Sequence, residues 1–411
     1  MQKAVERYEG MKDLSERISQ LITEKELVEM TMEMIKIPSY AGIENQETGV
    51  AKYIKSIFDR EEIPCRIEEV EAGRCNVIAT LKGDGNGKSL LLNGHTDTVE
   101  PNDMQRAFDP YIEDNKLYGR GASDMKGPIV SMMGAMIAIK RGKIKMAGDV
   151  TFTGVLDEEH NSIGTIDLIE KGIKAHAAIV GEPSNLQICT GHRGLEWYEF
   201  KFIGKTVHGG RQKEGVNAIA KAVKFINALE ADLIPKVYER KHSLLEEATV
   251  NYGVIHGGTQ LSTVAGECSL FVDRRFLPYE DYEEVTKEFQ QLIDKLSAED
   301  KDFKCNMRVT QESAMKEGYV HKAMEISKEH PVVKVVSDAV LQVTDKPPVY
   351  TFFPAWTDGG LLSNYADIPT VVIGPGIIEC CHSKEEHIPV DHLMKGCILY
   401  ALTAINFCNS K

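Results

Sequence analysis

The first part of the chain alternates between helical and strand-like hydrophobic patterns. Apolar residues recur with helical spacing from Leu27 to Ile35 and again from Glu47 to Phe58. Short apolar runs bounded by turn residues follow, as expected for buried strands of a parallel sheet: "CNVIATL", "SLLLNG", "DVTFTGVLD" and "HAAIVGE". The alternation predicts an α/β fold, with a mostly parallel sheet flanked by helices.

The pattern changes after Gly191. "LEWYEFKFIG", "TVNYGVIHGG" and "GECSLFVDRRF" alternate in the way of antiparallel strands that have one solvent-exposed face. Two helical stretches, Asn217 to Leu229 and Tyr279 to Leu296, separate these runs. The segment therefore predicts a small α+β unit.

The first pattern returns near the end of the sequence. A helix is expected from Pro331 to Val343, a strand in "IPTVVIGPG" and a further helix from Val390 to Phe407. Since 411 residues exceed what one hydrophobic core usually serves, more than one domain is expected. We predict a catalytic domain formed by residues 1–192 and 317–411, with residues 193–316 inserted into it.

Composition excludes several classes of function. A net charge of −14 disfavours binding to a phosphate backbone, so nucleic acid is not an expected partner. No uncharged stretch is long enough to span a bilayer, and the first 30 residues lack the apolar core of a secretory signal. Nine scattered cysteines without a CxxC pair favour a reducing, cytoplasmic location.

Ionisable residues follow the apolar runs or lie in glycine-rich loops. They are His95 and Asp97 in "GHTDTV", Asp124 in "GRGASDMKG", Glu158 and Glu159 in "LDEEH", Glu182 in "GEP" and His382 in "CCHSKEEH". Ligands of open α/β sheets bind outside the carboxyl ends of the strands, so we expect these side chains to lie together.

A set of imidazole and carboxylate groups suits zinc, although cobalt and manganese can occupy the same ligands. If Asp124 bridges two metal ions, His95 with Glu182 completes one site and Glu159 with His382 the other. Two ions about 3.5–4 Å apart can share a water molecule and lower its pKa toward about 7. The set therefore predicts amide hydrolysis at neutral pH with two zinc ions as cofactors.

Two further carboxylates have separate predicted roles. Glu158 is adjacent to a ligand and is not needed as one, so we expect it to be the general base. Asp97, two residues after His95, is expected to accept the second ring N–H of that ligand. Each of these residues taken alone also fits a turn, a cap or a surface charge, and Cys380 with Cys381 also fits a thiol nucleophile or thiolate ligand.

The motifs as a set resemble the acetylornithine deacetylase, succinyl-diaminopimelate desuccinylase and aminoacylase family of co-catalytic zinc amidohydrolases and exopeptidases. The resemblance runs from about residue 28 onward through "GHTDTV", "LYGRGASDMKG", "DEE", "GEPS", "GVNAI", "IHGGT" and the late "GPG" and His. It implies the same five metal ligands, with Asp124 bridging, Glu158 as acid/base and Asp97 as the partner of His95.

The resemblance also implies that the inserted segment is a lid and dimerisation domain of a homodimer. It assigns substrate binding to His208 in "GKTVHGG" and to an arginine of "VDRRF". The resemblance points to Arg275, and strand alternation places the adjacent Arg274 on the opposite face, so only one of the two can point inward. An arginine suits this role because its planar fork matches a carboxylate.

The sequence departs from the family pattern at "QLSTVAGE", where the family commonly has asparagine and proline, and "FPAWTDGG" resembles the substrate loop only loosely. The expected substrate is a small N-acyl amino acid, with a di- or tripeptidase or carboxypeptidase as the alternative. A noncatalytic metal-binding protein is disfavoured because Glu158 is present. A nucleotide-binding enzyme is disfavoured because "GDGNGK" and "GRGASDMKG" fit neither glycine-rich phosphate motif.

Overall fold

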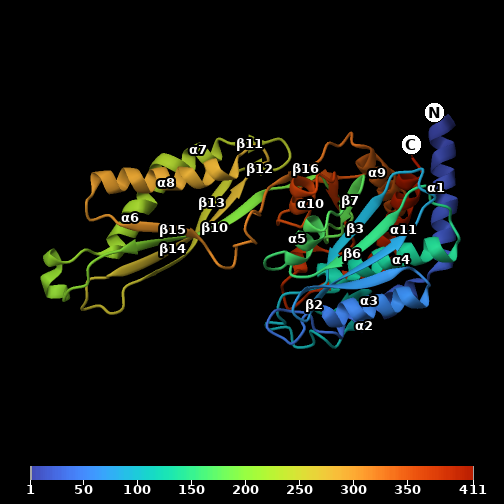
Figure 1. The fold of residues 1–411 in the computed structure, drawn as a ribbon, viewed down its shortest axis with the longest axis horizontal. Helices are drawn as coiled ribbons and strands as arrows, with labels where there is room; N and C mark the ends of the chain where they lie inside the picture. Colours follow the sequence, from blue (N-terminus) through green and yellow to red (C-terminus); the bar gives the residue numbers. More distant parts are fainter. Residues whose placement is uncertain (1, 411) are drawn as a thin grey trace. The chain divides into compact units, whose positions relative to one another are not determined.

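A computed structural model of the chain describes residues 2–410, which form two compact units (Figure 1). Unit 1 consists of the residues up to His192 and those from Met324 onward, and unit 2 consists of Arg193–Ala323. Unit 2 ends a little later than the expected boundary at 316. The segment before Ala323 stays with unit 2 because the Leu195 N–H donates to the His321 carbonyl.

Unit 1 is built on an eight-stranded sheet with the order β1-β2-β6-β3-β7-β18-β8-β17. The central pairs β6–β3, β3–β7 and β7–β18 are parallel, whereas β1 and β2 continue the sheet in antiparallel fashion. This confirms the expected mostly parallel sheet. The strands are β1 (Cys65–Glu71), β2 (Arg74–Leu81), β3 (Leu90–His95), β6 (Val150–Val155), β7 (Ala177–Val180), β8 (Ile188–Cys189), β17 (Tyr350–Thr351) and β18 (Thr370–Val372).

Helices cover both faces of this sheet. The helices of unit 1 are α1 (Gln2–Leu21), α2 (Glu24–Ile35), α3 (Thr48–Arg60), α4 (Gly127–Arg141), α5 (Ile163–Glu170), α9 (Pro331–Thr344), α10 (Gly359–Tyr365) and α11 (Val390–Cys408). Leu90 and Leu92 of β3 pack into the cluster formed with α4 and α11, whereas Leu91 packs on the opposite face near α10. Burial on both faces explains why β3 is a continuous apolar run.

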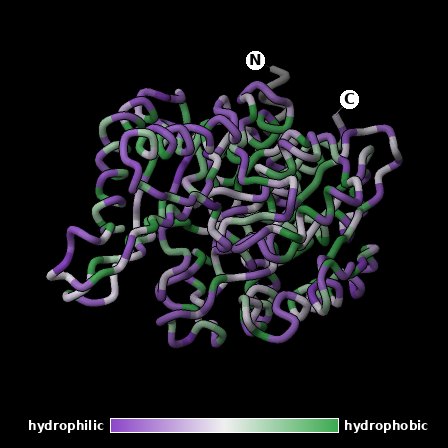
Figure 2. The backbone as a smooth tube through the Cα atoms, turned by 60° about the vertical axis from the view of Figure 1, so that its left-hand side comes forward, coloured by the Kyte–Doolittle hydropathy of each residue, from purple (hydrophilic) through white to green (hydrophobic). Residues whose placement is uncertain are grey.

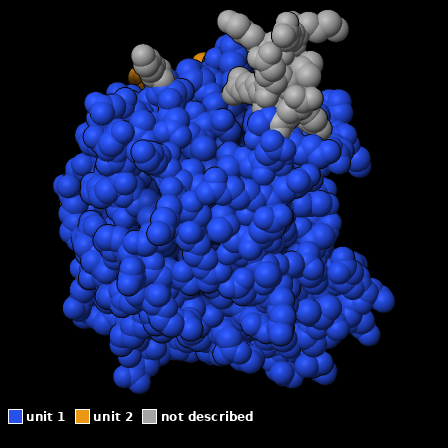
Figure 3. Space-filling model, turned by 90° about the vertical axis from the view of Figure 1, so that its right-hand side faces the viewer, with its two compact units in different colours: residues 1–192, 324–411 blue, residues 193–323 orange. Residues whose placement is uncertain are grey.

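The remaining elements of unit 1 are short. They are β4 (Tyr111–Glu113), β5 (Lys116–Tyr118), β19 (His387–Pro389), β9 (Gly191–His192), β16 (Met324–Glu325) and the turns η1 (Ala122–Lys126) and η4 (Ile378–Cys380). β19 pairs with β5, which brings the loops after β5 and before β19 side by side. Figure 3 shows one face of unit 1 as a space-filling surface, and Figure 2 shows hydrophobic stretches gathered toward the interior, inside largely hydrophilic loops.

Unit 2 is an antiparallel sheet of order β13-β14-β10-β15 with helices packed on one face. Its elements are β10 (Gly194–Ile203), η2 (Gly209–Glu214), α6 (Ala218–Ala228), η3 (Leu229–Leu233), α7 (Ile234–Tyr238), β11 (Lys241–His242), β12 (Glu246–Glu247), β13 (Thr249–Gly257), β14 (Glu267–Phe276), α8 (Tyr282–Glu299) and β15 (Cys305–Val309). Strand alternation in β14 buries Cys268, Leu270 and Val272, while the residues between them are partly exposed. Unit 2 is thus an α+β insertion.

Within residues 2–410, no helix combines the length and the apolar character that crossing a membrane requires.

Candidate metal centre

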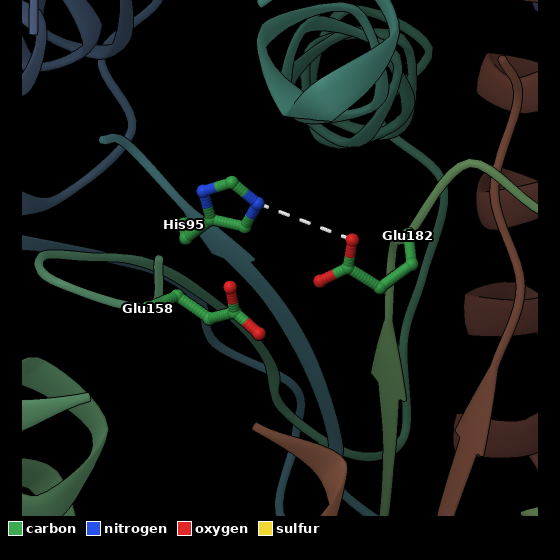
Figure 4. A group of neighbouring side chains, drawn as sticks. All are labelled: His95, Glu158 and Glu182. Atoms are coloured by element: carbon green, nitrogen blue, oxygen red, sulfur yellow. Dashed lines mark ion pairs between the residues drawn. The ribbon is translucent and has the colours of Figure 1, made fainter. Parts of the chain in front are cut away.

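Three neighbouring strands of unit 1 deliver charged side chains to one edge of the sheet. His95 is the last residue of β3, Glu158 and Glu159 lie in the turn after β6, and Glu182 follows β7. Because β3 is parallel to both β6 and β7, their carboxyl ends meet at the same edge. Figure 4 shows His95, Glu158 and Glu182 directed toward one another.

Asp124 lies between two imidazoles. Its Oδ1 is 3.0 Å from Nε2 of His95, and its Oδ2 is 3.2 Å from Nε2 of His382. Asp124 is 8% exposed and belongs to η1, which follows the glycine-rich loop and precedes α4. Gly121 enters this turn with φ +85°, a left-handed conformation that favours glycine. Each carboxylate oxygen of Asp124 therefore faces a different histidine.

His382 reaches the cluster from a loop rather than from a strand end. It follows η4, and its backbone has a left-handed φ of +58°. Its Nε2 lies 3.1 Å from Oε1 of Glu159. Glu159 and His382 thus flank the Oδ2 side of Asp124.

The Oδ1 side of Asp124 holds a second group. Glu182 Oε2 is 3.9 Å from Nε2 of His95. One ligand atom from each of His95, Glu158 and Glu182 lies within 4.8 Å of the others, and the same holds for His95, Asp124 and Glu159. The structure therefore brings all seven sequence-predicted residues of unit 1 into one cluster.

Asp97 has more partners than the sequence suggested. Its Oδ1 is 3.4 Å from Nδ1 of His95, and the Asp97 carbonyl is 3.1 Å from the same nitrogen. Its carboxylate also accepts the backbone N–H groups of Glu158, at 3.2 Å, and of Glu159, at 2.9 Å. Asp97 thereby connects the end of β3 with the turn after β6.

Burial and neighbouring negative charges raise the pKa values of two carboxylates of the cluster. Burial raises the pKa of Glu182 to about 8, and the nearby Asp124 and Glu159 carboxylates add to this shift. Burial, followed by the Glu182 carboxylate, raises the pKa of Glu158 well above its ordinary value. Such perturbed groups gathered in one place are typical of a functional site.

The pKa values of the two histidines are raised, although burial alone would lower them. Hydrogen bonding to Asp124 and then to Glu159 raises the pKa of His382 to about 10. Burial alone would lower the pKa of His95, but its bonds to Asp124 and Asp97 raise it well above the ordinary value. Both imidazoles are therefore surrounded by negative charge.

The donor set fits divalent cations. Carboxylate oxygens and imidazole nitrogens are ligands of zinc and its first-row neighbours. The buried Oε1 of Glu182 accepts no hydrogen bond from any described residue, so it has a lone pair available. The excess of carboxylates over imidazoles also leaves negative charge that a cation would neutralise.

A cysteine metal ligand has no support among residues 2–410, although the hydrogen bond with Cys381 lowers the pKa of the Cys380 thiol to about 6. The Cys380 Sγ donates to the carbonyls of Ile377 and His387, and the Cys381 Sγ donates to the carbonyl of Ile377. The groups of ligand atoms close enough to share a metal contain no cysteine. All nine cysteines are free thiols.

Two predicted substrate residues lie in unit 2. His208 is exposed, and its Nδ1 accepts the Gly210 N–H at the start of η2. Arg275 is partly exposed and pairs with Asp273, whereas Arg274 is fully buried with Glu280. This is the alternation expected of β14, and it leaves Arg275 on the face opposite the helices.

Three charged residues close to the cluster were not assigned from the sequence. Arg120 and Glu386 form a buried ion pair beneath η1. Asp358 is 1% exposed, its Oδ2 accepts the Thr165 hydroxyl, and its charge raises the pKa of Glu158. The "FPAWTDGG" motif signalled Asp358 only loosely, and Glu386 looked like one more acidic residue of an exposed loop.

Comparison with known proteins identifies relatives along nearly the whole chain. The profile of peptidase family M20/M25/M40 matches residues 91–406. The N-formyl-4-amino-5-aminomethyl-2-methylpyrimidine deformylase of Bacillus subtilis is 29% identical and the alignment covers 94% of this chain and 96% of that protein. The probable succinyl-diaminopimelate desuccinylase of Staphylococcus aureus (strain MRSA252) is 25% identical, and the alignment covers 95% of this chain and 99% of that protein. The acetylornithine deacetylase of Myxococcus xanthus is 28% identical, and the alignment covers 84% of this chain and 87% of that protein.

Solved structures with the same fold include peptidases. The aminopeptidase PepT of Bacillus cereus superposes with a TM-score of 0.77 at 22% identity, covering 95% of this chain and 100% of that one. The YXEP protein of Bacillus subtilis, a dinuclear metal-binding peptidase, gives a TM-score of 0.68 at 16% identity, covering 93% and 98%. At these identities the likeness establishes the fold alone.

Proposed function

We propose that this chain, which belongs to peptidase family M20/M25/M40, is a deacylase that hydrolyses the amide bond of a small N-acylated amino acid or amine. Its family membership makes it a metal-dependent hydrolase. The observation that carries the proposed chemistry is the position of Asp124, whose two oxygens face His95 and His382 separately. That arrangement suits a carboxylate shared between two metal ions.

The ligands divide into two groups around Asp124. His95 and Glu182 would hold one ion and Glu159 and His382 the other, with Asp124 shared between them. Zinc is the proposed metal because both imidazole and carboxylate donors are present, and cobalt or manganese would fit the same ligands. When bound, two such ions polarise the scissile carbonyl and make a water molecule acidic enough to react at neutral pH.

Glu158 is the proposed proton carrier. It lies beside His95 and Glu182, where its carboxylate is placed to accept a proton from the attacking water. The same carboxyl group then donates that proton to the departing amine. Asp97 keeps Glu158 in place by accepting its backbone N–H, and it also holds the ring of His95.

Substrate recognition is proposed to involve unit 2. Arg275 offers a guanidinium that matches a substrate carboxylate, and His208 offers an exposed imidazole. The buried Arg274 is occupied by Glu280 and is excluded from this role. We assign the carboxylate contact to Arg275 for that reason.

The deacylase assignment is preferred to the peptidase alternative because of which relatives match in sequence. The sequence relatives described above are named as a deformylase, a desuccinylase and a deacetylase. The likeness to the two solved peptidase structures is one of fold, at 22% identity or less. A small acyl group is the feature common to the names of the sequence relatives.

A second copy of the chain is the proposed protein partner. β13 is an edge strand of the unit 2 sheet, and its residues from Asn251 to Gly257 are exposed. Ile219 and Val223 of α6 and Ile255 of β13 add exposed apolar surface, and Ile219 lies beside Gly257 at the end of β13. An unpaired edge beside an apolar strip is a surface suited to a homodimer. The free thiols favour a reducing cytoplasm as its location.

Hydrolysis of defined substrates tests the proposal. The metal-loaded protein is assayed against N-formyl, N-acetyl and N-succinyl amino acids, an N-formyl aminomethylpyrimidine, and di- and tripeptides. We expect kcat/KM for at least one N-acyl compound to exceed that for every peptide. A peptide cleaved with higher kcat/KM than all N-acyl compounds would establish the peptidase alternative instead.

A further inference from the structure

A charged pair is completely buried next to the proposed metal centre. Arg120 Nη1 lies 2.5 Å from Oε2 of Glu386, and both side chains are 1% exposed. Removing two charges from water costs as much as their attraction returns in many proteins, so stability alone is a weak reason for such a pair. The other contacts of the pair indicate what it does.

The second oxygen of Glu386 holds the backbone that carries Asp124. Glu386 Oε1 accepts the N–H of Ser123 and the N–H of Asp124, both at 3.1 Å. The Ser123 hydroxyl donates to the carbonyl of His387 at 2.7 Å and accepts the N–H of Ile377 at 3.1 Å. The turn that bears Asp124 is thus attached on both sides to the loop that bears His382.

Arg120 attaches the same turn to a third segment. Its Nε donates to the carbonyl of Glu100 at 3.2 Å, and its backbone N–H donates to the carbonyl of Ala107 at 2.8 Å. Glu100 lies in the loop that leaves β3 just after His95. The segments carrying His95, Asp124 and His382 therefore converge on one ion pair.

We propose that Glu386 and Arg120 are positioning residues that hold Asp124 between the two metal positions. A shared carboxylate must keep both oxygens in register, and Asp124 has 3.0 and 3.2 Å to its two imidazoles. Glu386 fixes the backbone of Asp124, and Arg120 fixes Glu386. Both side chains are buried, so we assign neither a contact with the substrate. The inference rests on the metal centre of the proposed function.

A carboxylate is the group that this position requires. Both oxygens of Glu386 accept hydrogen bonds, one from the guanidinium and the other from two amides. Glutamine has one acceptor oxygen and one donor nitrogen, so either Arg120 or the amide pair would face a donor. The Glu386→Gln change therefore breaks one half of the arrangement while keeping the volume.

The test measures binding of Co²⁺ alone to metal-free protein by calorimetry and by visible absorption. We expect the wild-type chain to bind two ions. Glu386→Gln and Arg120→Lys should bind Co²⁺ about 10- to 100-fold more weakly, the range found when groups behind metal ligands are replaced. Circular dichroism and the unfolding temperature in chelator report the fold separately.

A buried pair in unit 2 provides the matched control. Glu280 accepts from Arg274 and Arg240 and from the N–H of Leu277, so it combines guanidinium and amide partners as Glu386 does. Glu280→Gln should lower the unfolding temperature and leave Co²⁺ affinity within about twofold of wild type.

The possible results separate the two proposals. Wild-type protein that fails to bind two ions would overturn the proposed metal centre itself. Wild-type binding of two ions, with Glu386→Gln affinity within twofold of it, would overturn the positioning role alone, as would an equal loss of affinity in Glu280→Gln. If Glu386→Gln does not fold, the affinity of Arg120→Lys decides by the same criterion.

Discussion

At the scale of single residues, chemically similar carboxylates of unit 1 make different contacts. Asp124 faces two imidazoles, Asp97 accepts two backbone N–H groups, and Glu386 accepts two more beside Arg120. The neighbours of each carboxylate, rather than its type, determine its protonation and its role.

Glu158 is the residue whose replacement should affect chemistry most directly. Glu158→Gln keeps the volume but cannot accept a proton, so we expect turnover to fall by at least about 10²-fold. Metal content, measured by atomic absorption, should be unchanged. Glu113→Gln, at an exposed position of β4, is the control and should retain full activity. Turnover of Glu158→Gln within tenfold of wild type would remove it as the base.

The two adjacent arginines of β14 should respond differently to replacement. Arg274→Ala removes one of the two guanidinium partners of the buried Glu280, so we expect a loss of roughly 1–3 kcal/mol in the free energy of unfolding. Arg275→Ala removes a guanidinium from the open face, so KM should rise about tenfold or more with little loss of stability. Denaturant unfolding measures the stability effect, and steady-state kinetics measure the effect on KM. Equal KM values for the two variants would contradict the assignment of Arg275.

At the scale of elements, the sheet of unit 1 explains why so much could be predicted. His95, Glu158, Glu159 and Glu182 all follow apolar strands, and parallel pairing brings their positions together whatever the loop details. His382 had no such signal, since it lies in a loop and its place depends on a left-handed backbone. Its motif suggested it, and its distance from Glu159 could come only from the fold.

The contacts behind the ligands could not be predicted from spacing. Glu386 meets Asp124 through β19 pairing with β5, across 262 positions of sequence. Asp97 was expected to hold His95, but its bonds to the backbone of Glu158 and Glu159 depend on the exact shape of a turn. Hydrogen bonds to backbone amides far away in sequence have no fixed spacing, so the sequence gives no signal for them.

The exposed edge of β13 gives a prediction about assembly. We expect Val223→Glu combined with Ile255→Glu to convert a wild-type dimer into a monomer, because two charges would enter an apolar contact. Light scattering after size-exclusion chromatography measures the mass. Ile112→Glu replaces an equally exposed isoleucine in unit 1 and should leave the dimer intact. A monomeric wild-type chain would contradict the proposed homodimer.

At the scale of the whole molecule, every proposed ligand belongs to unit 1, although unit 2 interrupts that unit in sequence. Metal binding should therefore stabilise one unit and not the other. Ligands that bind only the folded state stabilise it in proportion to the logarithm of their free concentration.

Removal of metal should reveal this difference in a thermal scan. With free metal at 100 times its dissociation constant, each bound ion adds about 2.7 kcal/mol, so two ions correspond to roughly 9 °C in the unfolding temperature of a unit of this size. We expect a chelator to lower the transition of unit 1 by that amount, with unit 2 unchanged and the loss reversed by added Zn²⁺. Equal shifts of both transitions, or none, would count against a metal centre confined to unit 1.

The interrupted course of unit 1 also affects how the protein is made. The ribosome synthesises the segments bearing His95, Asp124, Glu159 and Glu182 first, then all of Arg193–Ala323, and only afterwards His382. At translation rates of about 5–20 residues per second, unit 2 occupies on the order of ten seconds. A nascent chain therefore presents an incomplete set of the proposed ligands throughout that interval, and we expect cation loading to follow the emergence of His382.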